Sequence, residues 1–307
     1  MPERIFIKSA CQISCQSPLS EEWIDSPVAL SGNYLRSQDP KFSDFIPPMQ
    51  ARRMGLLLKR AVVTSQVALE KAGITLPDAI ITGTALGCME NTEKFLGKIC
   101  REGEQMLSPT DFMQSTHNTI SSLIAIRLHC KGYNCTYSHG ESSFGSALLD
   151  AAVQMRLGMI RNALVGCHDE TTEETFRILT HAGYFSEGDA PATELSVSMV
   201  LSTDPEGALC ELRQVKVINA SGRSTGEICR EALAKSGFAD FRGEVKILTD
   251  AECSQLFGKN LSLPAAGVYA GAQMVGSGKC PVAVVVGGSC GDERTVVVLS
   301  EKGLESC

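Results

Sequence analysis

Residues 134–149 read NCTYSHGESSFGSALL, a short β-branched and aromatic run that reaches a glycine and then begins an amphipathic helix. Strand-to-helix turns of this kind hold the nucleophile in several enzyme folds. The first helical turn offers unpaired N–H groups and a positive dipole end to a developing anion. The turn here carries Glu141, which is already an anion. Glu141 is interpreted either as a residue facing a substrate channel or as an ordinary acid at a helix N-terminus.

Ser142 allows a second interpretation of the same turn. A strand, Gly-Glu-Ser and a helix approximate the Gly-x-Ser-x-Gly elbow of the α/β-hydrolases. Phe144 stands where that pattern needs its second glycine. A triad of that kind also needs a late histidine, and the last histidine of this chain is His181. The sequence therefore disfavours a hydrolase.

Metal-ligating residue types occur together in His168, Asp169 and Glu170. Three consecutive residues at a strand end cannot all face one ion, so we interpret them as a polar loop. No two of the thirteen cysteines stand in a Cys-x-x-Cys arrangement, which disfavours zinc. We predict no metal site and no cofactor, and we expect most of the cysteines to be buried and inert.

Composition is typical of a globular protein with a large α/β core: 307 residues, 43% hydrophobic, with 28 glycines. The net charge is −7, and the Lys and Arg residues are scattered along the sequence. The broad basic face of a nucleic-acid binder is therefore not expected, which disfavours nucleic acid as a partner. The start MPERIFIKSACQISC has no apolar signal region, and no stretch approaches 18 uninterrupted apolar residues. We therefore expect a cytoplasmic protein with reduced thiols and no membrane segment.

Alternating strand and helix patterns surround the Glu141 turn. Gly73 is expected to end a helix over 51–73, and Asn91 could cap a helix over 91–103. The other helices are expected at 115–130, 142–158, 224–237 and 265–278. Strands are expected at 4–14, 79–87, 134–139, 162–170, 194–202, 209–219, 245–250, 281–288 and 294–300.

Two segments echo each other, 151–170 and 271–290. Both run from a small-residue helix carrying Gln-Met, through a glycine turn, into a Val/Ala strand. Helices this rich in Ala and Gly are apolar all round and belong between two layers. The pattern predicts a five-layer α/β/α/β/α stack built from two βαβ halves, residues 1–205 and 206–307.

The chain resembles the β-ketoacyl synthases of the thiolase superfamily. The run from SPTDFMQSTHNT through SHGESSFGSALL to NALVGCHDE (108–170) is similar to the family's nucleophile region. RRMGLLLKRAVVTSQVALEKAGI (52–74) and AIITGTALGCMENTEKFL (79–96) are similar to its first helix and second strand. NLSLPAAGVYAGAQM (260–274) resembles its Gly-His-x-x-x-Ala-Ala-Gly helix. The likeness is strongest over residues 52–202, and it implies the five-layer thiolase fold.

The resemblance also implies three catalytic residues that this chain lacks. The family's Thr-Ala-Cys-Ser-Ser motif places Glu141 at the nucleophile Cys, and its Gly-His motif places Leu261 at one catalytic His. The second His has no candidate near 245–253, and VVVGGSCGDER (284–294) replaces the family's Gly-rich loop. An ionised Glu is too poor a nucleophile for acyl transfer from a thioester, and Leu cannot move a proton. No catalytic residue of the family pattern is therefore expected to be intact.

Family members with a replaced nucleophile are chain-length factors, which pair with an active ketosynthase and shape its product pocket. The resemblance thus implies a non-catalytic subunit in fatty-acid-like, polyketide or aryl-polyene biosynthesis, with CTYSHGESS (135–143) near the dimer contact. The residues expected to face substrate are Glu141, Ser142, His139 and Phe144. Arg52, Lys59 and Arg60 are interpreted either as a docking surface for an acidic acyl carrier protein or as a solvated helix face.

Two other functions remain open from the sequence. One is a thiolase-fold acyltransferase or malonyl decarboxylase that acts on carrier-protein thioesters through Glu141, Ser142 or His139. The other is a free-standing homodimeric binding protein.

Overall fold

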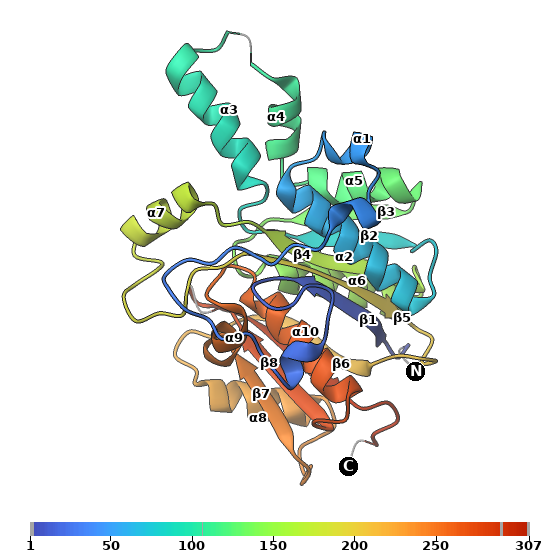
Figure 1. The fold of residues 1–307 in the computed structure, drawn as a ribbon. Coiled ribbons are helices and arrows are strands. Elements are labelled where there is room, and N and C mark those ends of the chain that lie inside the picture. The colour runs from blue at the N-terminus through green and yellow to red at the C-terminus, as the bar shows by residue number, and fades with distance from the viewer. Residues whose placement is uncertain (1–2, 106, 289–290, 306–307) are drawn as a thin grey trace.

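The fold is an α/β architecture built on one mixed sheet (Figure 1). The computed structural model describes residues 3–105, 107–288 and 291–305. The described strands form a nine-stranded sheet in the order β3-β2-β4-β5-β1-β6-β9-β8-β7. Their bounds are β1 Phe6–Ile13, β2 Ala79–Gly83, β3 Tyr133–Tyr137, β4 Asn162–Asp169, β5 Leu195–Ser202, β6 Cys210–Asn219, β7 Val245–Thr249, β8 Val282–Gly287 and β9 Glu293–Ser300.

Ten α-helices accompany these strands in the described part of the chain. Their bounds are α1 Pro48–Ala51, α2 Leu56–Ala72, α3 Met89–Glu102, α4 Pro109–Ser115, α5 Thr119–Leu128, α6 Ser143–Arg156, α7 Glu173–His181, α8 Thr225–Lys235, α9 Asp250–Phe257 and α10 Leu263–Gly276. Two short 3₁₀ turns, Glu22–Ile24 and Phe42–Asp44, lie in the loop between β1 and α1.

The two halves of the sheet repeat one topology. In the first half, β2 pairs parallel to β4, β4 antiparallel to β5, and β5 antiparallel to β1. In the second half, β7, β8, β9 and β6 pair in the same order and with the same directions. The first half has an additional edge strand, β3, which lies between β2 and α6 in the sequence. At the corresponding position of the second half, between β7 and α10, the chain forms helix α9 instead. The pseudo-repeat predicted from sequence is therefore present, and the second half is one strand shorter.

Five layers result, as the Ala- and Gly-rich helices predict. The central layer is the pair α6 and α10, whose Ala151 and Ala270 are fully buried in a core that both half-sheets share. Helices α2 and α5 cover the outer face of the first half-sheet, and α8 covers the outer face of the second. The half-sheets are joined at Phe6–Glu211 and Ile7–Cys210, which makes one continuous sheet of the two expected ones. The boundary predicted at 205/206 falls in the β5–β6 loop, and that division stays a prediction.

Sequence patterns located the long elements well. Gly73 ends α2 in the left-handed conformation (φ 67°), as expected. Asn91 does not cap α3, because the helix already begins at Met89, after Cys88, and Asn91 is buried within it. Helices α4, α7 and α9 were not expected.

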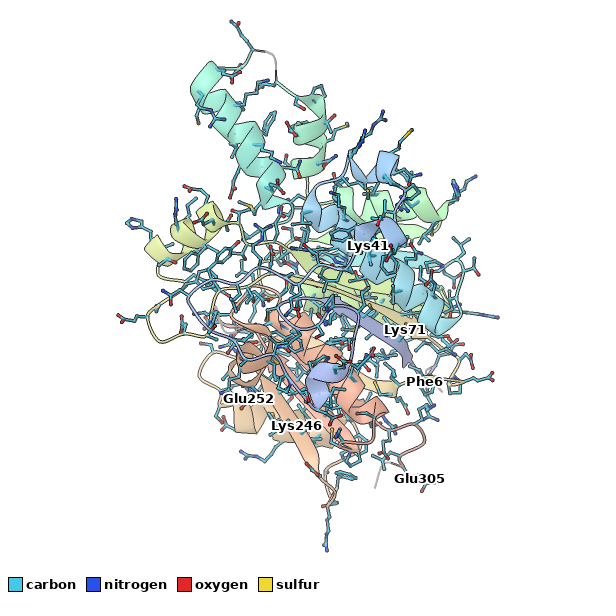
Figure 2. The ribbon with its side chains drawn as sticks, viewed as in Figure 1. Phe6, Lys41, Lys71, Lys246, Glu252 and Glu305 are labelled. Atoms are coloured by element: carbon cyan, nitrogen blue, oxygen red, sulfur yellow. The ribbon has the colours of Figure 1, made fainter. Side chains whose placement is uncertain are left out.

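Helices α3 and α4 form an arm that projects away from the layers (Figure 1). The rings of Phe95 and Phe112 lie 5.3 Å apart and join the two helices. Leu96, Phe112 and Met113 are each more than half exposed. In Figure 2 the side chains of this arm project into open space rather than onto the sheet. The arm thus offers apolar surface that the chain itself does not cover.

Eleven cysteines in the described residues are free, and eight of them are buried, whereas Cys100 is exposed. Burial raises the pKa of Cys11 and of Cys15 to about 12. Within the described ranges, no group of three His, Cys, Asp or Glu side chains could hold a metal ion. No helix in those ranges is long and apolar enough to span a membrane.

Candidate functional site

The site is built at the turn between β3 and α6. Gly140 takes a positive φ of 58°, which an L side chain rarely adopts, and the chain then enters α6 at Ser143. The N–H of Ser142 donates to the carbonyl of His139 (3.2 Å), and the N–H of Ser143 donates to the carbonyl of Gly140 (3.2 Å). The turn therefore satisfies two of the donors that would otherwise be free to bind an anion.

Glu141 lies at the centre of this turn and is 7% exposed. Its Oε1 accepts a hydrogen bond from the phenol of Tyr184 at 2.8 Å. Tyr184 belongs to the loop after α7, so this loop closes over the turn. The carboxylate of Glu141 is therefore held in position by a hydrogen bond from outside the turn.

Tyr184 is itself held by Lys259. The Lys259 ammonium donates to the carbonyl oxygen of Tyr184 at 2.6 Å, lies 4.9 Å from its ring centroid, and pairs with Asp189 at 2.8 Å. This bond from Lys259 is the main cause that lowers the pKa of Asp189. Lys259 precedes α10, so the chain Glu141–Tyr184–Lys259 connects both halves of the protein.

Asp169, at the end of β4, forms a second connection between the halves. One carboxylate accepts the hydroxyl of Thr84 (2.8 Å), three backbone N–H groups of residues 85–87 (2.8–3.1 Å), and the hydroxyl of Ser262 (2.6 Å). The carbonyl of Thr84 in turn accepts the hydroxyl of Ser143 at 2.9 Å. Asp169 thus ties the β2 loop, the elbow helix and the start of α10 together.

Leu261 is placed at this junction by its neighbour Ser262. The residue is half-buried at the entrance to α10. The elbow and the segment carrying Leu261 are connected through Ser143, Thr84, Asp169 and Ser262. The structure therefore links the two segments that carry Glu141 and Leu261. That these residues stand at the family's nucleophile and histidine positions stays a prediction.

His168, Asp169 and Glu170 bond in three different directions. His168 Nδ1 pairs with the hydroxyl of Ser196 at 2.7 Å, and burial lowers the pKa of His168 to about 3. Glu170 Oε1 accepts the backbone N–H of Glu90 at 2.8 Å. Burial raises the pKa of Glu170 to about 7. The three side chains support three different elements and do not share one site.

The other predicted substrate residues differ in exposure. Ser142 is 5% exposed and has an ordinary helical backbone (φ −79°, ψ −5°), which removes the strained geometry that a hydrolase nucleophile needs. His139 is exposed, with Nδ1 3.2 Å from the hydroxyl of Ser146. Phe144 is 1% exposed and packs in the central core. Contact of these residues with a substrate stays a prediction.

The predicted docking set needs one correction. Arg60 is 1% exposed and pairs with Asp39 (2.6 Å) and with the buried Glu194 (2.8 Å). Its guanidinium points into the protein, so Arg60 cannot contact a carrier protein. Arg52 is exposed and Lys59 is half-buried, and both remain available.

A cavity of about 580 Å³ lies beside α2 and α5, and the sequence analysis did not predict it. Arg53, Arg127 and His129 contribute cationic or titratable groups to its wall, and Leu123 and Ile126 contribute apolar ones. Arg53 could have been added to the predicted docking set from the sequence, because it is next to Arg52. Arg127 and His129 could not be added to the set, because they come from the end of α5.

The chain belongs to the β-ketoacyl synthase family. The family description "Beta-ketoacyl synthase, N-terminal domain" matches residues 23–237, more than two thirds of the chain. No curated protein sequence matches it.

Solved structures share the fold across nearly the full chain. A type II polyketide acyl-carrier protein complex with its ketosynthase bound to the hexaketide aligns with a TM-score of 0.79 at 12% identity, covering 98% of this chain and 99% of that chain. The ishigamide ketosynthase/chain length factor aligns at 0.78 and 16% identity, covering 98% and 100%. A ketosynthase in complex with its chain length factor from Xenorhabdus doucetiae aligns at 0.62 and 17% identity, covering 97% and 99%. At these identities the likeness establishes the fold, which ketosynthases and chain length factors share.

Proposed function

We propose that this chain is a non-catalytic subunit of the chain-length-factor kind, which pairs with an active ketosynthase in the synthesis of a polyketide, an aryl polyene or a fatty-acid-like product. The observation that carries the proposal is the hydrogen bond from Tyr184 to Glu141, the residue that the motif predicts at the nucleophile position. The prediction of Leu261 in place of a histidine supports it. Since no histidine follows His181, the second half offers no imidazole for decarboxylation.

Two surfaces support a partner. Strand β3 ends the described sheet and pairs only with β2 there, so its other edge has backbone groups to offer a second chain. The arm of α3 and α4 exposes Phe112 and Met113. Apolar residues of this size favour burial in an interface.

A basic cavity supports contact with an acidic carrier protein. Arg52 is exposed next to Arg53, which lines the cavity with Arg127. This cluster is local in a chain of net charge −7. Opposite charge would steer a carrier protein to this face.

Co-expression with a ketosynthase that retains its Cys and both His tests the proposal. We expect a stable 1:1 complex whose product length changes when this chain is exchanged for another family member. Glu141→Gln keeps an acceptor for Tyr184 but removes the charge, and it should leave product yield within about twofold. Recovery of this chain alone, with no influence on the length of the partner's product, would refute the pairing.

The same variant distinguishes the alternative, an acyltransferase or malonyl decarboxylase working through Glu141. The specific observation in its favour is the carboxyl–phenol pair of Glu141 and Tyr184 in a nearly closed site. The purified chain would then release CO₂ from a malonyl carrier protein without any ketosynthase. Glu141→Gln would abolish that turnover, whereas the proposed function predicts none in either protein.

A further inference from the structure

A second cavity, of about 480 Å³, lies at the opposite end of α6 from the Glu141 turn. Helix α6 has 14 residues and runs from Ser143 to Arg156, so the two places are about 20 Å apart. The wall of the cavity comes from the N-terminal segment before β1, from β6, and from the C-terminal ends of α6 and α8.

Cationic side chains dominate this wall. The cations are Arg4, Arg156, Arg213, Lys216 and Lys235, against the two acids Glu3 and Glu211. The convergence is notable because the chain as a whole has a net charge of −7. Five cations from four separate segments create a strong local positive potential.

The two guanidiniums of Arg4 and Arg213 share one carboxylate. Glu211 is 3% exposed and accepts from Arg4 Nε at 2.9 Å, while Arg213 Nη1 lies 3.4 Å from the same Oε1. One carboxylate cannot neutralise both groups. Burial and the nearby Arg4 lower the pKa of Arg213, although Glu211 opposes this shift.

Arg213 is also fixed in position before any ligand arrives. Its Nε donates to the hydroxyl of Ser300 at 2.8 Å, its Nη2 donates to the carbonyl of Leu304, and its Cζ lies 5.3 Å from the ring centroid of Phe238. Fixed donors lose little entropy when they bind, which favours recognition of an anion.

The lysines form a second pair of like charges. Burial and the neighbouring Lys235 lower the pKa of Lys216. Lys235 forms an ion pair with Glu231, whereas no carboxylate of the described residues lies within ion-pair distance of the Lys216 ammonium. Two ammonium groups held together on the cavity wall provide mobile donors beside the fixed guanidiniums.

We propose that this cavity binds a small molecule carrying a multiply charged phosphate group, a phosphate monoester or a diphosphate. A planar carboxylate can use one guanidinium fork, whereas a tetrahedral phosphate can accept from donors on several sides at once. The cavity volume lies in the range of small-molecule sites and leaves room for an organic group beyond the phosphate. This site is independent of the Glu141 turn and of the proposed partnership.

Titration of the full chain with inorganic pyrophosphate, followed by calorimetry at about 0.1 M salt, tests the proposal. We expect saturable 1:1 binding that weakens at least tenfold in the double variant Arg156→Gln/Lys216→Gln. Both substitutions lie on the wall and spare the fixed Arg213–Glu211 group. Circular dichroism checks that the variant is folded.

The matched control is Lys41→Gln/Lys246→Gln, which removes the same charge from two exposed lysines that do not line the cavity. Figure 2 labels both residues. It should retain affinity within about twofold, because only general electrostatics change. An equal loss in both double variants, or no saturable binding of pyrophosphate, would overturn the proposal. Citrate binding as tightly as pyrophosphate would overturn its assignment to phosphate.

Discussion

The motif comparison predicts that Glu141 occupies the place where the β-ketoacyl synthase pattern puts a thiol. Its surroundings fit a structural acid: the turn's own carbonyls take the N–H groups of Ser142 and Ser143, and Tyr184 donates to its Oε1. A reactive thiolate needs nearby donors that stay free for the developing oxyanion. The local bonding is therefore consistent with loss of the nucleophile rather than with its replacement.

The Glu141–Tyr184 bond should be measurable in a double-mutant cycle. Tyr184→Phe and Glu141→Ala are each expected to lower the free energy of unfolding by about 1–3 kcal/mol, because each removes one side of a largely buried hydrogen bond. The double variant should lose less than the sum of the two, with a coupling of about 1 kcal/mol. Urea unfolding of the four proteins gives these values. Strict additivity would mean that the contact contributes nothing to stability.

Motif alignment predicted the two changed residues but not what holds them. Glu141 and Leu261 follow directly from the motifs around them. Tyr184 lies 43 residues after Glu141, in a loop without periodicity, and only the folded arrangement of α7 brings it over the turn. The same reason explains Asp169, which the sequence presented as one member of a polar cluster.

At the scale of elements, the end of β4 anchors the α3–α4 arm. Glu170 Oε1 accepts the N–H of Glu90 in the first turn of α3, and the hydroxyl of Thr175 on α7 donates to Glu93 at 2.8 Å. A carboxylate at a helix N-terminus is favourable. Glu170 is nevertheless 1% exposed, and burial penalises its charged form enough to raise its pKa to about 7.

This buried acid predicts a pH dependence of stability. The folded pKa of Glu170 lies above its ordinary value of 4.5, so its contribution is present below pH 4.5 and is lost as the pH rises through about 7. Glu170→Gln keeps an acceptor for Glu90 and avoids the buried charge. At pH 8 it should raise the free energy of unfolding relative to the native chain, by at most about 3 kcal/mol.

Urea unfolding at pH 5 and pH 8 measures this effect. Glu173→Gln, on an exposed side chain of α7, is the control and should change stability by less than about 0.5 kcal/mol at both values. A gain from Glu170→Gln that is equal at the two pH values would contradict a titrating buried acid.

The long helices and strands could be predicted because each shows a single hydrophobic periodicity along its whole length. The high Ala and Gly content of α6 and α10 predicted that these helices are buried, and Gly73 predicted the end of α2. Helices α7 and α9 were missed because they are short, with nine and eight residues, so the hydrophobic periodicity in each covers only about two turns. Arg60 was misassigned because a cation on a helix resembles a surface residue until Asp39 and Glu194 are placed beside it.

At the scale of the whole molecule, the pseudo-repeat leaves two unlike edges. The first half-sheet ends at β3, directly before the Glu141 turn, and the second ends at β7, because that half lacks a counterpart of β3. Each edge exposes one large hydrophobic side chain to a similar degree, Tyr133 at 43% on β3 and Ile247 at 41% on β7. The two edges therefore allow a matched comparison of where a partner subunit binds.

If the proposed ketosynthase partner adds its sheet to β3, Tyr133→Glu should weaken the complex and Ile247→Glu should not. A charge placed in a desolvated strand contact costs at least about 1.4 kcal/mol, which corresponds to a tenfold rise in the dissociation constant. Sedimentation of the co-expressed complex measures this constant for both variants. Each substitution sits on an exposed edge, so unfolding curves of the isolated variants should agree within about 0.5 kcal/mol. Equal weakening by both variants, or weakening by Ile247→Glu alone, would exclude β3 as the contact.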